Sequence, residues 1–188
     1  MSERSEEYRK ITALFVAGKL DEGIQSLENA KNSLPRSEFI ECSGNLHFYK
    51  REFQEACDLY EKAMMADPDY DVCRYHYLIG VQEERHGEPL KAFERYQASI
   101  EIDPTFVDAY IELGGLLAKA EDYEGALTCY TDALRLDRND LRIFANRAEI
   151  LLALSIADPT RHFEYLAALS EYTAAKARLP AIDERYVW

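Results

Sequence analysis

Residues 107–140, VDAYIELGGLLAKAEDYEGALTCYTDALRLDRND, decide the fold of this chain. Gly114 stands twelve residues before Ala126, and Tyr130 follows four residues after that alanine. The pattern also occurs twice upstream, as Gly44 with Ala56-Tyr60-Ala63 and as Gly80 with Ala92-Tyr96-Ser99. The chain therefore contains an internal sequence repeat.

The spacing resembles that of the tetratricopeptide repeat family, whose unit of 34 residues has these small and aromatic positions. Residues 107–140 match best, with Tyr110 in place of the family's Trp and Arg138 in place of its closing Pro. The resemblance extends over 4–180, nearly the whole chain. We expect one domain, 1–188, made of the units 4–36 (degenerate), 37–70, 73–106, 107–140 and 141–180, with a tail at 181–188.

The resemblance implies an all-α fold, a right-handed α-solenoid of about five helix hairpins. Most tyrosines fall on positions that the family fills with core aromatic residues. We expect these tyrosines to be buried between helices: Tyr60, Tyr96, Tyr110, Tyr123, Tyr130, Tyr165 and Tyr172.

The last unit exceeds the family length by eight residues, and Asp158-Pro159 stands in its middle. Asp is a favoured N-cap and Pro suits the first helical position, so a helix is expected to start there. The extra residues then add roughly one turn, about 3.6 residues, to each helix. Three alternatives remain for covering the end of the core: the longer hairpin itself, another copy of the chain, or Tyr186 and Trp188 folded back over it.

The chain is strongly acidic, with 22 basic and 35 acidic residues and a net charge of −13. Nucleic acid and anionic membranes would be repelled, so neither is expected as a partner. No apolar stretch is long enough to cross a membrane, and no signal peptide is evident. The four cysteines are interpreted as reduced thiols, and a cytoplasmic location is expected.

In this family the first helix of each unit lines a concave groove. The corresponding positions of the third and fourth units hold Arg74, Tyr77, Leu78, Val81, Glu84 and Arg85, and Asp108, Ile111, Glu112, Gly115, Ala118 and Lys119. From all five units we select these candidate partner-binding residues: Tyr8, Arg9, Glu41, Asn45, Phe48, Tyr49, Arg74, Tyr77, Asp108, Glu112, Arg142 and Asn146. For Phe48 the alternative is that it packs beneath the first helices.

Some family members hold the acidic C-terminus of a heat-shock chaperone with a clamp of Lys, Asn and Arg side chains. Here only Asn45 matches that clamp, and Glu41, Asp108 and Glu112 stand where it has cations. A carboxylate clamp is therefore not expected. The reversed charges favour a basic or hydroxyl-rich segment as the ligand.

The expected function is non-catalytic protein binding, by an adaptor, scaffold or chaperone-like module that holds a peptide segment in its groove. One alternative is a partner-neutralising secretion chaperone or immunity protein that uses its acidic surface. Another is a self-assembling structural protein that uses its exposed end faces. Cys73 and His76 have the spacing of half a metal site, but no second half follows. No catalytic residue, metal or cofactor is expected.

Overall fold

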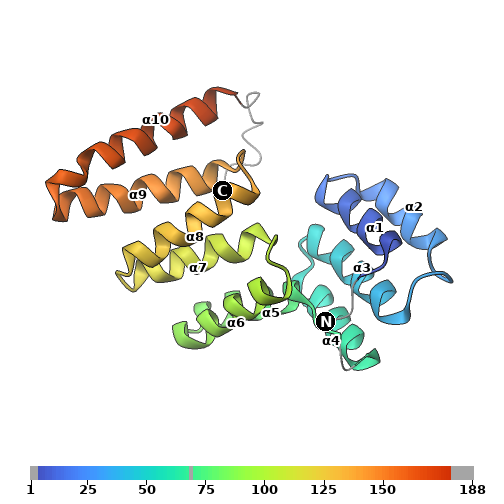
Figure 1. Ribbon diagram of the computed structural model, residues 1–188. Helices are drawn as coiled ribbons and strands as arrows, with labels where there is room; N and C mark the ends of the chain where they lie inside the picture. Colours follow the sequence, from blue (N-terminus) through green and yellow to red (C-terminus); the bar gives the residue numbers. More distant parts are fainter. Residues whose placement is uncertain (1–3, 68–69, 179–188) are drawn as a thin grey trace.

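The computed structural model describes residues 4–67 and 70–178. Within them, ten α-helices form five hairpins that follow one another along the chain (Figure 1). The helices are α1 (Glu6–Val16), α2 (Leu20–Asn29), α3 (Arg36–Tyr49), α4 (Phe53–Ala66), α5 (Cys73–Arg85), α6 (Pro89–Ile102), α7 (Val107–Lys119), α8 (Tyr123–Leu136), α9 (Leu141–Ala157) and α10 (His162–Arg178). Each hairpin packs against the next one. The predicted fold class, an all-α solenoid of about five hairpins, is confirmed.

A glycine against a tyrosine ring closes each of the three central hairpins. The pairs are Gly44–Tyr60, Gly80–Tyr96 and Gly114–Tyr130. The three rings are at most 2% exposed. A Cβ atom at Gly44 would lie 2.5 Å from Cε1 of Tyr60, so no larger residue lets the two helices approach this closely. The remaining family tyrosines are only half-buried, which corrects their predicted burial: Tyr110, Tyr123, Tyr165 and Tyr172.

The last hairpin is the longest. Helices α9 and α10 have 17 residues each, whereas α3 to α8 have 13 or 14. The Asp158 side chain accepts a hydrogen bond from the Thr160 backbone N–H, and Pro159 begins a short 3-10 turn, η1 (Pro159–Arg161). This turn joins the two helices and leaves almost no irregular loop between them.

The outer face of this hairpin carries large apolar side chains that no described residue covers. Half of the large exposed hydrophobic residues in the described part of the chain are found on α9 and α10: Leu152, Ile156, Phe163, Leu166 and Leu169. The longer hairpin therefore does not cover the end of the core by itself. Tyr186 and Trp188, which the third alternative requires, lie outside the described residues.

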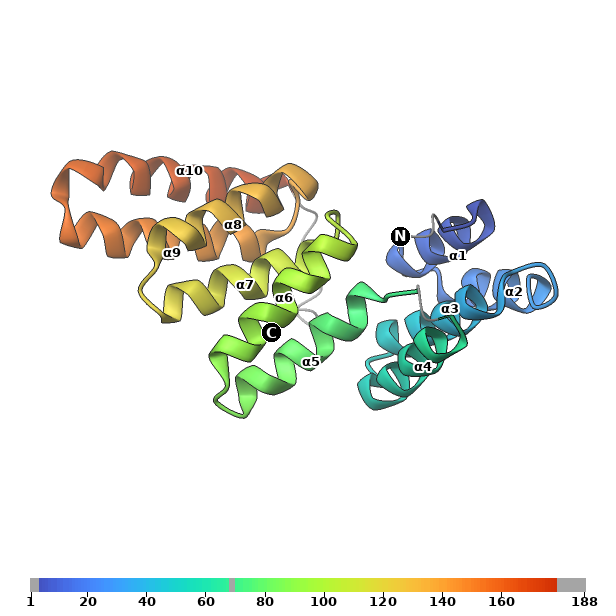
Figure 2. The same ribbon diagram turned by 60° about the horizontal axis from the view of Figure 1, so that its bottom comes forward.

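The second and third hairpins are the most loosely joined neighbours. Figure 2 shows α1–α4 on one side of α5–α10. We call the described side chains that meet between these two parts the α4–α5 junction: Phe48, Tyr49, Phe53, Tyr70, Arg74, Tyr77 and Phe106. Packing of α4 against α5 is sparser than packing between the later hairpins. The ring of Phe48 bridges the junction, with its centroid 6.1 Å from that of Tyr77 and 6.4 Å from that of Phe106.

Among the described residues, no helix is both long enough and apolar enough to cross a membrane.

Candidate functional site

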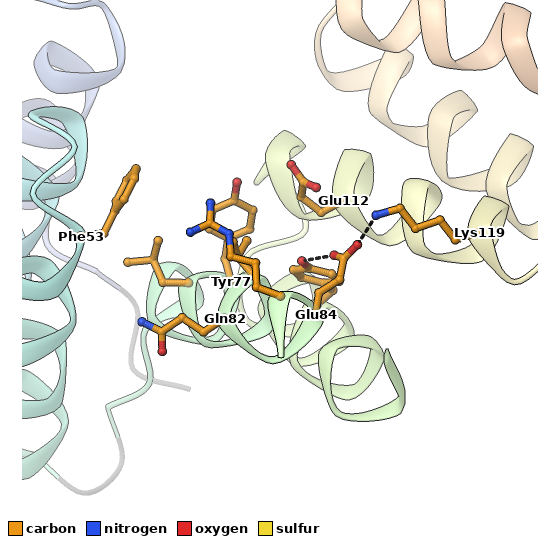
Figure 3. A pocket seen from close by; sticks show the side chains of 10 residues that line it. Phe53, Tyr77, Gln82, Glu84, Glu112 and Lys119 are labelled. Atoms are coloured by element: carbon orange, nitrogen blue, oxygen red, sulfur yellow. Dashed lines mark hydrogen bonds and ion pairs between the residues drawn. The ribbon is translucent and has the colours of Figure 1, made fainter. Parts of the chain in front are cut away.

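A groove of about 490 Å³ opens beside the α4–α5 junction, along the inner sides of α5 and α7 (Figure 3). We call it the α5–α7 groove. It is lined by Phe53, Tyr77, Leu78, Val81, Gln82, Glu84, Arg85, Tyr96, Glu112 and Lys119. Most of these residues occupy the repeat positions that the family resemblance assigns to the concave face. Whether they contact a partner stays a prediction.

The floor of the α5–α7 groove is apolar. Tyr77, Leu78 and Val81 follow one another at helical spacing on α5, and Leu78 is buried. Phe53, at the start of α4, stands across the groove from them (Figure 3). Its side chain is 43% exposed although it is aromatic, because no helix covers it at the α4–α5 junction. The groove thus offers an aromatic wall and an aliphatic floor to a ligand.

Two of the three carboxylates near the floor already have cationic partners. Glu84 accepts hydrogen bonds from the Tyr96 hydroxyl at 2.9 Å and from the Lys119 ammonium at 2.5 Å. Asp108 accepts one from Arg142 at 2.8 Å. These pairs join α5 to α7 and α7 to α9, so they stabilise the stacking of the last three hairpins.

Glu112 is the third carboxylate, and no hydrogen bond or ion pair reaches it from the described residues. It is half-buried. Burial, followed by repulsion from Glu84 and Asp108, raises the pKa of Glu112 above its usual range. Burial, followed by repulsion from Asp108 and from Glu112 itself, raises the pKa of the Tyr77 hydroxyl. The site therefore favours a positive charge placed beside Glu112.

The first two hairpins have a closed polar core where a groove was predicted. The Glu41 carboxylate is 2% exposed and accepts hydrogen bonds from Tyr8 Oη at 2.7 Å, Tyr70 Oη at 2.6 Å and Arg4 Nε at 3.1 Å. Asn45, fully buried, accepts one from Tyr60 Oη at 2.9 Å. Tyr8, Glu41 and Asn45 are thus internal contacts in this structure. The reason is that α1 packs directly on α3 and leaves no open space between them.

Arg74 is also buried rather than on the groove surface. Its guanidinium lies over the rings of Phe48, Tyr49 and Phe106, at 5.8, 5.7 and 5.1 Å from their centroids. Nη2 donates a hydrogen bond to Tyr49 Oη at 3.1 Å. Arg74 therefore holds the α4–α5 junction together by stacking on aromatic rings, and Phe48 and Tyr49 serve the same packing.

The other candidates are spread over the rest of the solenoid. Tyr77 and Glu112 line the α5–α7 groove, and Asp108 and Arg142 form an ion pair beside it. Asn146 lies near the Tyr130 hydroxyl within the later hairpins. Arg9 is exposed on α1, far along the chain from the groove residues. The structure brings together only part of the predicted set.

Phe53 and Tyr70 were missed by the sequence interpretation. Phe53 begins the second helix of its unit, as Tyr123 does two units later, and this aromatic position was a usable signal. Tyr70 lies between the helices of neighbouring units, where the repeat pattern assigns no contact. Its hydroxyl donates a hydrogen bond to Glu41, which lies 29 residues earlier in the chain.

Within residues 4–67 and 70–178, no three His, Cys, Asp or Glu side chains gather at a distance suited to a metal ion. The His76 ring instead meets the Asp71 carboxylate at 2.9 Å, and the Cys73 thiol lies 3.9 Å from Asp103. This pair is therefore part of the packing at the start of α5.

Comparison with known proteins gives matches to both the sequence and the fold. A family model described as tetratricopeptide repeat matches residues 107–140. The probable UDP-N-acetylglucosamine–peptide N-acetylglucosaminyltransferase SPINDLY of Hordeum vulgare is 30% identical over 84 residues. That alignment includes 42% of this chain and only 9% of the barley protein. The chain thus spans about a tenth of the length of this curated relative.

Two solved structures share the overall arrangement of helices. The crystal structure of MamA superposes with a TM-score of 0.55 at 16% identity, over 94% of this chain and 96% of that one. The structure of YrrB, described as a TPR protein with an unusual peptide-binding site, has a TM-score of 0.50 at 17% identity, over 94% and 88%. Residues 107–140 are thus a tetratricopeptide repeat, and the five stacked hairpins have the fold of tetratricopeptide repeat proteins.

Proposed function

We propose that this protein is a non-catalytic binding module that holds a peptide segment of a partner protein in the α5–α7 groove. The observation that carries the proposal is the groove itself, which combines an apolar floor with exposed polar groups on two neighbouring hairpins. Binding sites generally have this composition, because apolar contact supplies affinity and a few polar groups fix orientation. The fold shared with YrrB, which is described as a TPR protein with an unusual peptide-binding site, is consistent with this function.

The four described cysteine thiols are not suited to nucleophilic catalysis. A cysteine nucleophile needs a lowered thiol pKa, whereas burial raises the pKa of Cys57 and of Cys129 to about 11. Cys42 and Cys73 are more deeply buried, and the pKa values of their thiols are raised as well. None of these thiols is prepared for nucleophilic attack at neutral pH.

Blocking the floor of the groove is expected to abolish peptide binding. Val81 lies on α5 at the centre of the lining residues, so Val81→Arg places a long charged side chain where a ligand would pack. Peptides selected by the full chain from a displayed random library should bind the Val81→Arg variant at least about tenfold more weakly. Fluorescence anisotropy with the selected peptides measures the loss, and circular dichroism checks that the helices are retained.

Leu90→Arg is the matched control, because Leu90 is 80% exposed at the start of α6 and lies outside the groove. This variant should bind as the parent chain does. Equal binding by all three proteins would contradict the proposal. If that binding also weakened steeply with salt, the binding surface would be the acidic exterior instead.

A second candidate function is self-association through the α9–α10 face. The favouring observation is the set of exposed apolar side chains there, with Phe163 82% and Ile156 75% exposed. A solenoid end of this kind needs a cover, and a second copy presents the same apolar patch about a two-fold axis. Sedimentation velocity should show a mass that rises with concentration toward that of a dimer.

Phe163→Asp should keep the chain monomeric at every concentration, because it places a charge in the contact. Leu90→Asp, at an equally exposed position on α6, should leave the association unchanged. A parent chain that stays monomeric up to high concentration would remove this candidate.

A further inference from the structure

We infer that the α5–α7 groove selects a basic side chain, lysine or arginine, whose cationic head pairs with the Glu112 carboxylate while its stem lies over Tyr77 and Val81. This inference rests on the proposed function, since it names the class of peptide that the groove accepts. The occupant is a segment of a partner protein with a basic residue at one fixed position.

The first support is the difference between Glu112 and its two acidic neighbours. Glu84 is bound by Lys119 at 2.5 Å, and Asp108 by Arg142 at 2.8 Å. Glu112 has no such partner among the described residues, although it stands between these pairs on the wall of the same groove. A half-buried carboxylate without a donor is unfavourable, and a ligand cation would supply the missing hydrogen bonds.

The second support is that the two cations nearest Glu112, Arg142 and Lys119, are engaged by other carboxylates. The Arg142 guanidinium is also held by Asp140 at 2.6 Å, which keeps it on α9. The Lys119 ammonium is bound to Glu84, and Figure 3 shows it reaching toward that carboxylate rather than toward Glu112. Arg85 lines the groove but makes no ion pair with Glu112. Neither Arg142 nor Lys119 therefore occupies the place of a ligand cation beside Glu112.

The third support is the shape of the surface beside Glu112. In Figure 3 the side chains of Tyr77 and Glu112 come from different helices and point toward the same part of the groove. Lysine and arginine bury their aliphatic stems on apolar surface while the charged head stays polar. The face of an aromatic ring also attracts a cation. Tyr77 and Val81 thus suit the stem, and Glu112 suits the head.

The arrangement makes binding depend on pH. Because the pKa of the Glu112 carboxyl is raised in the absence of a ligand, a proton competes with the ligand cation as pH falls. A bound cation lowers that pKa, so affinity is full above the raised pKa and is lost as pH falls through it. The charged or titratable groups around Glu112 are Tyr77, Glu84, Arg85, Tyr96, Asp108, Lys119, Tyr130 and Arg142.

Selection from a displayed random peptide library, with the full chain as bait, tests the inference. Enriched peptides should share lysine or arginine at one fixed position. Glu112→Gln keeps the shape of the side chain and removes its charge. This variant should bind the enriched peptides about tenfold or more weakly, and its binding should no longer depend on pH. Glu101→Gln, the same change at an exposed site on α6, should leave both properties unchanged.

The outcomes separate this inference from the proposed function. Peptides that Val81→Arg rejects, but that lack a shared basic residue and bind Glu112→Gln normally, would overturn the inference and leave the groove function intact. A basic preference that persists in Glu112→Gln would also overturn it. Failure to enrich any peptide that Val81→Arg rejects would overturn the groove function itself.

Discussion

Replacing Glu41 by alanine is expected to lower the free energy of unfolding by about 3 kcal/mol, because it leaves a half-buried cation and two buried hydroxyls without their shared acceptor. The Glu41 carboxylate accepts hydrogen bonds from Arg4, Tyr8 and Tyr70, which come from three separate parts of the chain. Its removal leaves Arg4 with a second acceptor, the Asp71 backbone carbonyl, at 2.6 Å. Chemical denaturation followed by circular dichroism measures the change.

Two further variants define the cause of this loss. Glu55→Ala removes an exposed glutamate on α4 and should change the free energy of unfolding by no more than about 0.5 kcal/mol. Glu41→Gln keeps an acceptor oxygen, so its loss in free energy of unfolding should lie between the losses of the two alanine variants. A cost below about 1 kcal/mol for Glu41→Ala would show that water replaces the carboxylate, which is incompatible with a buried site.

The second large effect is expected at Gly114. A methyl group there would lie 2.7 Å from Cε1 of Tyr130, whose ring is 2% exposed and cannot turn aside without losing its packing. Overpacking of this kind costs typically about 1–3 kcal/mol, which exceeds the gain of about 1 kcal/mol from replacing a helical glycine by alanine. Gly114→Ala should therefore destabilise the protein, as measured by thermal and chemical unfolding.

Gly115, the next residue on α7, provides an unusually close control. A Cβ atom there would meet only Tyr130 Oη, at 3.8 Å, which is an ordinary contact. Alanine has a higher helix propensity than glycine, and at position 115 its methyl group makes no clash. Gly115→Ala should therefore stabilise the protein by up to about 1 kcal/mol. The two adjacent substitutions are expected to differ in sign. The same sign for both would mean that α7 and α8 do not approach as closely as described.

The repeat pattern in the sequence predicted the hairpins and the closest contacts within them. Gly44, Gly80 and Gly114 stand at one repeat position, and each faces a tyrosine ring of the second helix. These contacts are local to a single hairpin, so they depend only on helix geometry and residue size. The pattern also indicated the side of α5 and α7 on which the α5–α7 groove opens, because each position has a defined face.

Contacts between hairpins were less predictable. Glu41 and Asn45 stand on the face assigned to the groove, but α1 covers that face and buries both side chains. The repeat position specifies the direction of a side chain but not the distance to the next hairpin. Arg4 and Tyr70, which complete the Glu41 site, lie outside the helices that the pattern describes. Phe53 lines the groove because of the loose α4–α5 junction, for which the repeat spacing has no signal.

The α4–α5 junction gives the molecule two blocks with a weak coupling between them. In a stacked repeat protein each module is stabilised by its immediate neighbours, so cooperativity is lowest where neighbours touch least. One wall of the groove, Phe53, belongs to the N-terminal block, whereas Tyr77 and Glu112 belong to the C-terminal block. A peptide in the groove would therefore contact both blocks, and its free energy of binding would add to the coupling between them.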